Sequence, residues 1–570
     1  MASGLPEGDP MKRLSRLLIA WSCLATSTAF LFAGSPKLAP DLPVDLGLAP
    51  VDVVVQLNTI PTVAEIARLA GLGKITQQYS FVPAIGLRLP GVLVSLLEAD
   101  PLVAYISPDR PVKGMADLTT AAVNADQAFQ SGLTGAGIGV AIVDSGIDPH
   151  PDLAGRIVFR ESLVPANHPD DYGHGTHVAG ILAGSGASSS GPQFTNTFRG
   201  VAPGANLIDI RVLDANGMST DSTVIKGIDE AIRLSGKYKI RVINLSLGRP
   251  ILESYYLDPV CTAVAAAWKK GIVVVVAAGN LGRNGYATIT SPGNSPYAIT
   301  VGAMKTEGTP QRDDDAIASY SSRGPTWIDL GVKPDIVAPG NLITSLLAPG
   351  STLAAEYPQN IVAPSSYTAG ASSGTPQYFT LSGTSMATPV VSGAAAILLQ
   401  AEPSLSPDTL KARLMKTASK TFPLTSTAVD PATGAAYTDT YDIFTVGAGY
   451  LDIEAALQNK DATAGVALSP SLQWNVLLNA ALLVRPSNAV WDNNTWSLRN
   501  VWGPRAVVST TAGSSAAWGT SAAWGSSVVW GTSAAWGTCA AWGTSAAWGT
   551  SAAWGTSAAW GTSTSGEGEQ

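Results

Sequence analysis

The sequence contains little cysteine, and its three cysteines lie far apart. Cys23 falls in an apolar N-terminal stretch, Cys261 in the middle of the chain and Cys539 in a repetitive C-terminal stretch. A disulfide framework needs an even number of cysteines at conserved-looking spacings, so the pattern excludes a small disulfide-stapled fold. We expect Cys261 to be a buried, apolar residue.

Charge is also scarce. Only 13% of the 570 residues are charged, the formal net charge is −8, and no stretch is rich in lysine or arginine. Phosphate binding needs clustered basic side chains, so nucleic acid is not expected as a partner. The length itself predicts more than one domain.

Long apolar runs are nearly absent. The clearest is Leu17–Gly34, which follows the basic segment Met11-Lys-Arg and is interrupted by Ser and Thr. A basic start, a short apolar run and small residues near Ala29 and Gly34 predict a secretory signal over residues 1–34, with Met11 as a candidate start. An uncleaved anchor is the alternative. We expect no other membrane span, only transient membrane contact, and a secreted or cell-surface protein.

Residues 35–112 predict a small α+β domain. Strands are expected at 51–57, 74–80, 84–89 and 103–106, with helices at 62–72 and 92–99. The order is βαββαβ, and Pro108 and Pro111 interrupt regular secondary structure after it.

Residues 113–460 predict a doubly wound α/β domain with a mostly parallel sheet. Apolar runs at 140–143, 207–212, 242–247 and 272–277 are typical of strands that are buried on both faces. Helical stretches lie at 174–183, 222–234, 259–270 and 385–399. Ligands of such sheets bind at the carboxyl ends of the strands, where Asp144, Ser246 and Asn280 fall.

Three motifs in this domain carry the residues of covalent acyl transfer. Asp144 lies in Val-Asp-Ser-Gly-Ile-Asp, His174 in Gly-His-Gly-Thr-His, and Ser385 in Ser-Gly-Thr-Ser-Met-Ala-Thr-Pro. A serine hydroxyl needs a base such as imidazole, and the imidazole needs a carboxylate that fixes its tautomer. Asp148 competes with Asp144 for the carboxylate role, but it lies past the strand end.

These motifs resemble those of the subtilisin-like serine proteases, the subtilases, over roughly residues 118–457. The order Asp, His, Ser is that of subtilisin. The resemblance implies that Asp144, His174 and Ser385 are catalytic and that Asn280, in Ala-Ala-Gly-Asn, completes an oxyanion hole with the N–H of Ser385. It also implies that His177 is a packed helix residue, and that residues 35–112 are an inhibitor-type propeptide that the enzyme removes near residues 107–117.

The same resemblance implies a substrate site made mainly of backbone. Two segments would flank the primary specificity pocket, Ser246-Leu247-Gly248 and Ala277-Ala278-Gly279. Gly217, in Gly-Met-Ser, would lie on the edge that pairs with an extended peptide. Thr290 falls where the family often has glycine at the pocket floor, which predicts a pocket too narrow for the largest aromatic side chains.

No cofactor is expected for the chemistry. Asp152, in His-Pro-Asp-Leu, matches a position that binds a structural Ca²⁺ in some relatives. The loop that would complete that site is not recognisable between residues 184 and 200, which form a longer, Ser-rich stretch. A calcium site at Asp152 is therefore a weak expectation.

The C-terminal part differs in composition. Residues 461–513 predict a linker or a small β appendage, and residues 514–570 are Ser-Ala-Ala-Trp-Gly-Thr repeats. Tryptophan recurs every six residues at Trp518, Trp524, Trp530, Trp536, Trp542, Trp548, Trp554 and Trp560. A flexible tail is one interpretation. In an extended chain all these rings lie on one face, where they could stack on glycans or on other tails.

We therefore expect a secreted serine endopeptidase that cleaves its own propeptide, which acts as an intramolecular inhibitor, and then hydrolyses proteins or peptides. One alternative is a non-catalytic binding protein, but all four catalytic positions are intact. The other is a surface or assembly protein whose Trp repeats determine its role, with proteolysis limited to maturation.

Overall fold

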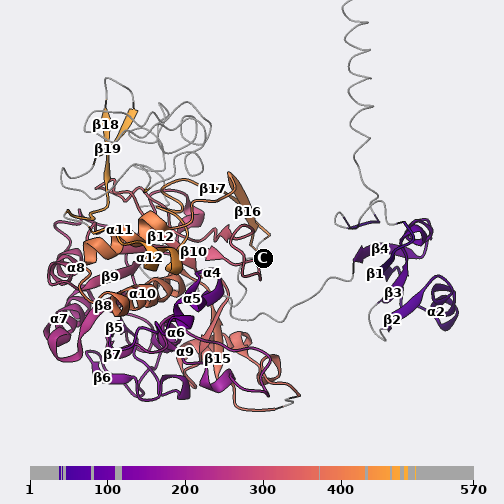
Figure 1. Ribbon diagram of the computed structural model, residues 1–570, viewed down its shortest axis with the longest axis horizontal. Coiled ribbons are helices and arrows are strands. Elements are labelled where there is room, and N and C mark those ends of the chain that lie inside the picture. The colour runs from indigo at the N-terminus through magenta and orange to yellow at the C-terminus, as the bar shows by residue number, and fades with distance from the viewer. Residues whose placement is uncertain are drawn as a thin grey trace, which may run out of the picture. The chain divides into compact units, whose positions relative to one another are not determined.

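The computed structural model describes residues 37–39, 42, 47–78, 83–108, 119–370, 373–430, 434–462, 465–475, 480–484 and 495 (Figure 1). These residues divide into two compact units, with the boundary between Lys113 and Gly114. The expected signal segment, the processing region after residue 108 and the Trp repeats lie outside the described residues.

The first unit is a four-stranded antiparallel sheet with two helices. The sheet order is β2-β3-β1-β4. Its elements are β1 (Pro50–Leu57), α2 (Val63–Ala70), β2 (Lys74–Gln78), β3 (Ala84–Pro90), α3 (Val94–Glu98) and β4 (Val103–Pro108). This is the βαββαβ order that the sequence predicts.

Local sequence explains these elements. Thr62 and Glu65 form a capping box at the start of α2, in which each side chain bonds the other residue's backbone N–H. In β1, Val53, Val55 and Leu57 alternate with more exposed residues and pack against Leu69 of α2 in one apolar cluster. The unit therefore has its own hydrophobic core.

The second unit is built on an eight-stranded, mostly parallel sheet. The order is β11-β10-β9-β8-β5-β7-β6, with β12 beside β10, and β11 is antiparallel to β10. The strands are β5 (Gly139–Asp144), β6 (Ile157–Ser162), β7 (Asn206–Arg211), β8 (Ile240–Leu245), β9 (Val273–Ala277), β10 (Ile299–Lys305), β11 (Ala316–Ile317) and β12 (Ile336–Pro339). The predicted doubly wound architecture is confirmed.

Helices cover both faces of this sheet, because neighbouring strand residues point in opposite directions. Val140 and Ile142 belong to one apolar cluster with α6 and α10, whereas Ala141 and Val143 belong to a second cluster with α7 and α8. The helices of this unit are α4 (Thr119–Ala122), α5 (Ala125–Gln130), α6 (His174–Ala183), α7 (Asp221–Tyr238), α8 (Pro259–Lys269), α9 (Thr352–Glu356), α10 (Thr384–Ala401), α11 (Pro407–Thr417) and α12 (Ile453–Gln458).

The expectation that no stretch after the N-terminal segment is long and apolar enough to cross a bilayer is wrong for helix α10. It is long and apolar enough to cross a membrane by length and composition, but 89% of it is buried inside the unit. It packs against α6 and against strands β8, β9 and β10, so its apolar character is that of a core helix.

Three small antiparallel sheets complete the unit. Their strands are β13 (Ile343–Leu346) with β15 (Tyr378–Leu381) and β14 (Ile361–Val362), then β16 (Thr425–Val429) with β17 (Ala436–Thr440), and β18 (Ser471–Asn475) with β19 (Ala480–Val484). The last pair falls in the predicted β appendage. Leu472 and Leu483 nevertheless belong to the main core, and the N–H of Val332 bonds the carbonyl of Pro470.

Strand β5 marks the point where the chain reverses direction across the sheet. After β5 the chain first forms β6 and β7 on one side of it. It then crosses to the other side and forms β8, β9 and β10. Such a switch point opens a crevice at the carboxyl ends of the strands. Asp144 is the last residue of β5, so it stands at this crevice.

Candidate active site

Asp144 and His174 form a buried hydrogen-bonded pair. His174 begins α6, and its Nδ1 lies 2.7 Å from Asp144 Oδ1, with both side chains fully buried. An ionised carboxylate only accepts, so Nδ1 carries the hydrogen and Nε2 is left as the basic atom. Asp148 donates its backbone N–H to Thr176 Oγ1, whereas the carboxylate that meets His174 Nδ1 is that of Asp144.

Ser385 is the second residue of α10. Its Oγ donates to the carbonyl of Ser246 at 3.1 Å, and Ser246 Oγ donates to the carbonyl of Ser385 at 2.8 Å. Helices α6 and α10 pack directly against each other. Within the described part of the chain, His174 Nε2 is buried and has no hydrogen-bond partner.

Asn280 is oriented by the residue that precedes Ser385. Its Oδ1 accepts from the N–H and the hydroxyl of Thr384, at 2.9 and 3.0 Å. The amide nitrogen therefore turns toward Gly383. A Cβ at Gly383 would lie 3.3 Å from Asn280 Nδ2 and 3.6 Å from the backbone N of Ser385. Two donors thus converge on one small space, which glycine leaves open.

Thr290 lies between the two segments that the sequence analysis assigns to the specificity pocket. Its N–H donates to the carbonyl of Ala278 at 3.0 Å. A Cβ at Gly248 would meet Thr290 Oγ1 at 2.5 Å, and one at Gly279 would meet Thr290 Cγ2 at 2.8 Å. Leu247 is fully buried, so this segment can offer a ligand mainly its backbone.

Gly217 does not lie in a strand. It has a φ of +72° in a tight turn, in which its N–H bonds the carbonyl of Asp214. A Cβ at this position would lie 2.6 Å from the ring of Tyr172, and that ring lies 6.4 Å from the ring of His174. The turn at Gly217 therefore contacts Tyr172, and Tyr172 in turn lies beside His174. The sequence predicted no role for Tyr172.

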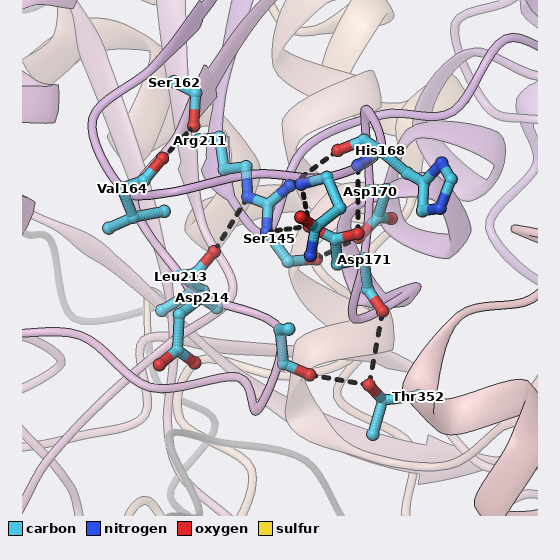
Figure 2. Close-up of polar contacts among 12 residues, drawn as sticks. Ser145, Ser162, Val164, His168, Asp170, Asp171, Arg211, Leu213, Asp214 and Thr352 are labelled. Atoms are coloured by element: carbon cyan, nitrogen blue, oxygen red, sulfur yellow. Dashed lines mark hydrogen bonds and ion pairs between the residues drawn. The ribbon is translucent and has the colours of Figure 1, made fainter.

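Arg211 anchors the loop that precedes α6. It stands at the end of β7 with only 2% of its surface exposed, and its three guanidinium nitrogens bond Asp171 Oδ2, the carbonyl of His168 and the carbonyl of Leu213 (Figure 2). Thr352, at the start of α9, donates to the carbonyl of Asp171 from its N–H and its hydroxyl. The loop before His174 is thus fixed from two sides.

His177 is a packed helix residue, as expected. Its Nε2 lies 3.1 Å from the carbonyl of Ile343 and 3.0 Å from that of Phe379, so this nitrogen donates to both. Burial, followed by the nearby His174, lowers the pKa of His177 to about 3. His177 therefore joins α6 to strands β13 and β15 as a neutral ring.

The Asp152 environment does not fit a calcium ion. Asp152 Oδ1 accepts from the N–H of Ser188 at 2.7 Å, and Oδ2 accepts from the hydroxyl of Tyr378 at 2.9 Å. Both carboxylate oxygens are thus engaged by protein donors, whereas Ca²⁺ needs several free oxygen ligands. Among the described residues, no group of three or more acidic, His or Cys side chains could hold a metal ion.

Cys261 is buried and not bonded to another cysteine. Its burial is as expected, and its Sγ also lies 3.2 Å from Asn294 Oδ1, a distance that suits a thiol donating to a carbonyl oxygen. Burial raises the pKa of this thiol well above its usual value, which makes it chemically inert.

Comparisons with known proteins identify the family and several relatives of this chain. A model of the Subtilase family matches residues 135–447. Serine protease AprX of Bacillus subtilis (strain 168) is 44% identical over 331 residues, which cover 56% of this chain and 71% of that protein. Subtilisin E of the same strain is 35% identical over 354 residues, covering 61% and 78%. Alkaline protease of Shouchella clausii is 35% identical over 350 residues, covering 60% and 76%.

Proposed function

The chain belongs to the subtilase family of subtilisin-like serine proteases, and from this premise we propose that it is a secreted or cell-surface endopeptidase whose nucleophile is Ser385. The observation that carries the proposal is the buried hydrogen bond between His174 Nδ1 and Asp144 Oδ1, which leaves Nε2 free of protein partners in the described chain. Proteins and peptides are the substrates.

In the first half of the reaction, Ser385 Oγ attacks the scissile carbonyl carbon while its proton passes to His174 Nε2. Asp144 stabilises the imidazolium that forms. The carbonyl oxygen becomes an oxyanion and accepts hydrogen bonds from Asn280 Nδ2 and the N–H of Ser385. The position of Ser385 at the N-terminus of the 18-residue helix α10 also favours negative charge there.

In the second half, His174 gives the proton to the leaving amine, and the C–N bond breaks to leave an acyl ester on Ser385 Oγ. A water molecule then loses a proton to His174 and attacks the ester carbon. The acid product leaves, and the proton returns to Ser385 Oγ. No metal ion takes part in these steps.

Substrate selection is proposed to depend on backbone pairing and on one narrow pocket. The segments 246–248 and 277–279 flank the substrate's primary side chain, and Thr290 closes the floor between them. Gly217 and its turn, against Tyr172, form the neighbouring edge. This arrangement favours small and medium side chains over Phe or Tyr.

The first unit is proposed to be the propeptide. Its own core and its compact βαββαβ fold support a segment that folds as a unit before it is removed. Strand β4 lies at the edge of the sheet and ends at Pro108, which falls within the expected processing region of residues 107–117. Ser385 would cut this connection.

Intact mass and N-terminal sequencing of the purified chain test the nucleophile and the propeptide together. Wild type is expected to lose roughly its first 110 residues, whereas Ser385→Ala stays uncut, because removal of a subtilisin nucleophile costs about 10⁶ in kcat. That magnitude was measured on subtilisin itself. The control is Ser366→Ala, an exposed serine at the end of a short 3₁₀ helix, which should be processed normally. Identical cutting of wild type and Ser385→Ala would refute self-processing.

A further inference from the structure

Asp170 is a buried carboxylate that the proposed chemistry does not use. It lies four residues before His174, and only 2% of its surface is exposed. Its Oδ1 accepts from Ser145 Oγ at 2.8 Å and from the N–H of Gly173 at 2.7 Å. Its Oδ2 accepts from the N–H and the hydroxyl of Thr176, at 2.8 and 2.6 Å. Figure 2 shows Asp170 and Ser145 within this network.

Ser145 connects this carboxylate to both members of the Asp144–His174 pair. Its N–H donates to Asp144 Oδ1 at 2.7 Å, the same oxygen that His174 Nδ1 approaches. Its hydroxyl accepts from the N–H of Gly175 at 2.8 Å, directly after His174. One serine thus holds the acid with its backbone and the helix that carries the base with its side chain.

Asp170 also caps the N-terminus of α6 in place of Gly173, which has no side chain to do so. Gly173, at the helix boundary, has no side chain and a φ of +97°. A Cβ there would lie 2.4 Å from Ser351 Oγ, so a capping side chain cannot stand at this position. The first backbone N–H groups of a helix need acceptors, and the positive end of the helix favours an anion. Asp170 meets both needs from three residues upstream.

We propose that Asp170 is a positioning residue for catalysis: through Ser145 and the first turn of α6, it sets the hydrogen bond between His174 and Asp144 and so the direction of His174 Nε2. The inference rests on the proposed function of His174 as the base. Asp170 touches neither substrate nor reacting atoms, so its effect is on geometry alone.

Only an ionised carboxylate fits this position. Gly173 and Thr176 present backbone N–H groups, one to each oxygen, and neither can accept. The two hydroxyls also donate here, because each accepts another N–H, that of Gly175 or that of Asp148. An asparagine would have to point its NH₂ at one of the two backbone donors. Either orientation opens the first turn of α6 or its link to Ser145.

Kinetics of Asp170→Asn test the proposal, with Asp171→Asn as a matched control. Asp171 is the next carboxylate in the chain and is also mostly buried, but its side chain bonds Arg211 and the N–H groups of Asn167 and His168. We expect Asp170→Asn to lower kcat about 10- to 100-fold with KM nearly unchanged, because small misplacements of a catalytic group cost this much. The pKa of the acid limb of kcat/KM should also fall, because the carboxylate of Asp144, which favours the charged form of His174, is displaced from the ring. Asp171→Asn should lower stability and leave the pH profile unchanged.

A second readout does not depend on activity. In a Ser385→Ala background, the proton between His174 Nδ1 and Asp144 should give a far-downfield ¹H resonance. This signal should move upfield or vanish with Asp170→Asn and persist with Asp171→Asn. If Asp170→Asn does not fold, Ser145→Ala decides by the same two readouts, because it removes one link and leaves three of the four bonds to Asp170.

An unchanged resonance, or a kcat and pH profile equal to those of Asp171→Asn, would overturn the proposal. The resonance reports on the Asp144–His174 pair even if Ser385 proves not to be the nucleophile. Failure of the inference is therefore separable from failure of the proposed function, which the processing of Ser385→Ala tests.

Discussion

At the scale of single residues, the site depends on two positions where side-chain size is decisive. Gly383 has no Cβ, and the space this leaves is where Asn280 Nδ2 and the N–H of Ser385 converge. Thr290 does the opposite, because its side chain occupies the space between Gly248 and Gly279. In the proposed site, the missing side chain of Gly383 leaves room for an oxyanion, and the side chain of Thr290 reduces the room for a substrate side chain.

Thr290→Gly should widen the proposed pocket. Removing the hydroxyl and the methyl group frees space beside Gly248 and Gly279, so turnover after Phe or Tyr should rise relative to turnover after Ala. A change of one or two carbons in a pocket is worth about 10- to 200-fold in kcat/KM. A panel of peptides that differ only in the residue before the cut measures this ratio.

The control for this substitution is Thr288→Gly, two residues earlier, whose hydroxyl donates to the carbonyl of Gly285. It should leave the ratio unchanged. If wild type already prefers Phe or Tyr, Thr290 does not limit the pocket and the assignment is wrong.

At the scale of elements, the three-stranded sheet β13-β15-β14 supports the loop that precedes residue 200. Tyr378, which begins β15, donates to Asp152 and packs its ring 4.6 Å from that of Phe198. Ser188 and Ser189 in the Ser-rich stretch bond the same two side chains. The protein thus uses a tyrosine and backbone N–H groups where the resemblance suggested a metal.

Tyr378→Phe should destabilise the fold by about 1–3 kcal/mol, because Asp152 Oδ2 then loses its buried donor. The decisive comparison is the gap in Tm between wild type and Tyr378→Phe, measured with and without EDTA in the Ser385→Ala background. Asp152 binds protein donors rather than a metal, so the gap should be the same in both conditions. Tyr256→Phe, at an exposed position, is the control. A gap that closes on chelation would show that a metal ion sits at Asp152.

Sequence patterns predicted the elements whose signal is local and missed those that depend on crossing loops. The strands around Asp144 and Ala277 and the helix that starts at His174 follow from apolar runs and glycine-rich starts. Asp170 and Tyr172 have no periodicity or motif of their own, and the motif that contains Ser145 predicts no role for that serine. Their roles arise only because the loop before α6 folds back across the end of β5.

The inserted sheet was missed for a related reason. Its strands are two to four residues long, and Pro, Ser and Gly separate them, so neither the alternation of a strand nor a hairpin turn is visible. The contacts of Asp152 could not be predicted either, since Tyr378 is 226 residues away. Contacts between residues so far apart in the chain leave no pattern in the local sequence.

At the scale of the whole molecule, a neutral buried histidine makes stability depend on pH. The pKa of His177 is about 3 in the fold, and about 6.5 is normal for an exposed ring. Below pH 6.5 the unfolded chain binds a proton that the folded chain does not, so stability falls as the pH falls toward 3. One such proton contributes a slope of up to about 1.4 kcal/mol per pH unit.

Urea unfolding at pH 7, 6 and 5 measures this slope, again in the Ser385→Ala background. His177→Gln keeps a donor for the two carbonyls but cannot titrate, so its stability should fall less steeply with acid. The free-energy difference between the two proteins should therefore shrink from pH 7 to pH 5. Parallel curves would mean that the pKa of His177 is the same in the folded and the unfolded chain.

The position of Ser385 on helix α10 has a consequence for how the enzyme ages. All the side chains from Thr384 to Leu399 are buried, so the proposed nucleophile stands on a helix of the domain interior. A copy whose interior opens loses its reactive hydroxyl in the same event that exposes its chain to other copies. Unfolded molecules become substrates for folded ones and cannot cleave them in return. A population of this protease can therefore degrade its unfolded copies without losing folded copies to them.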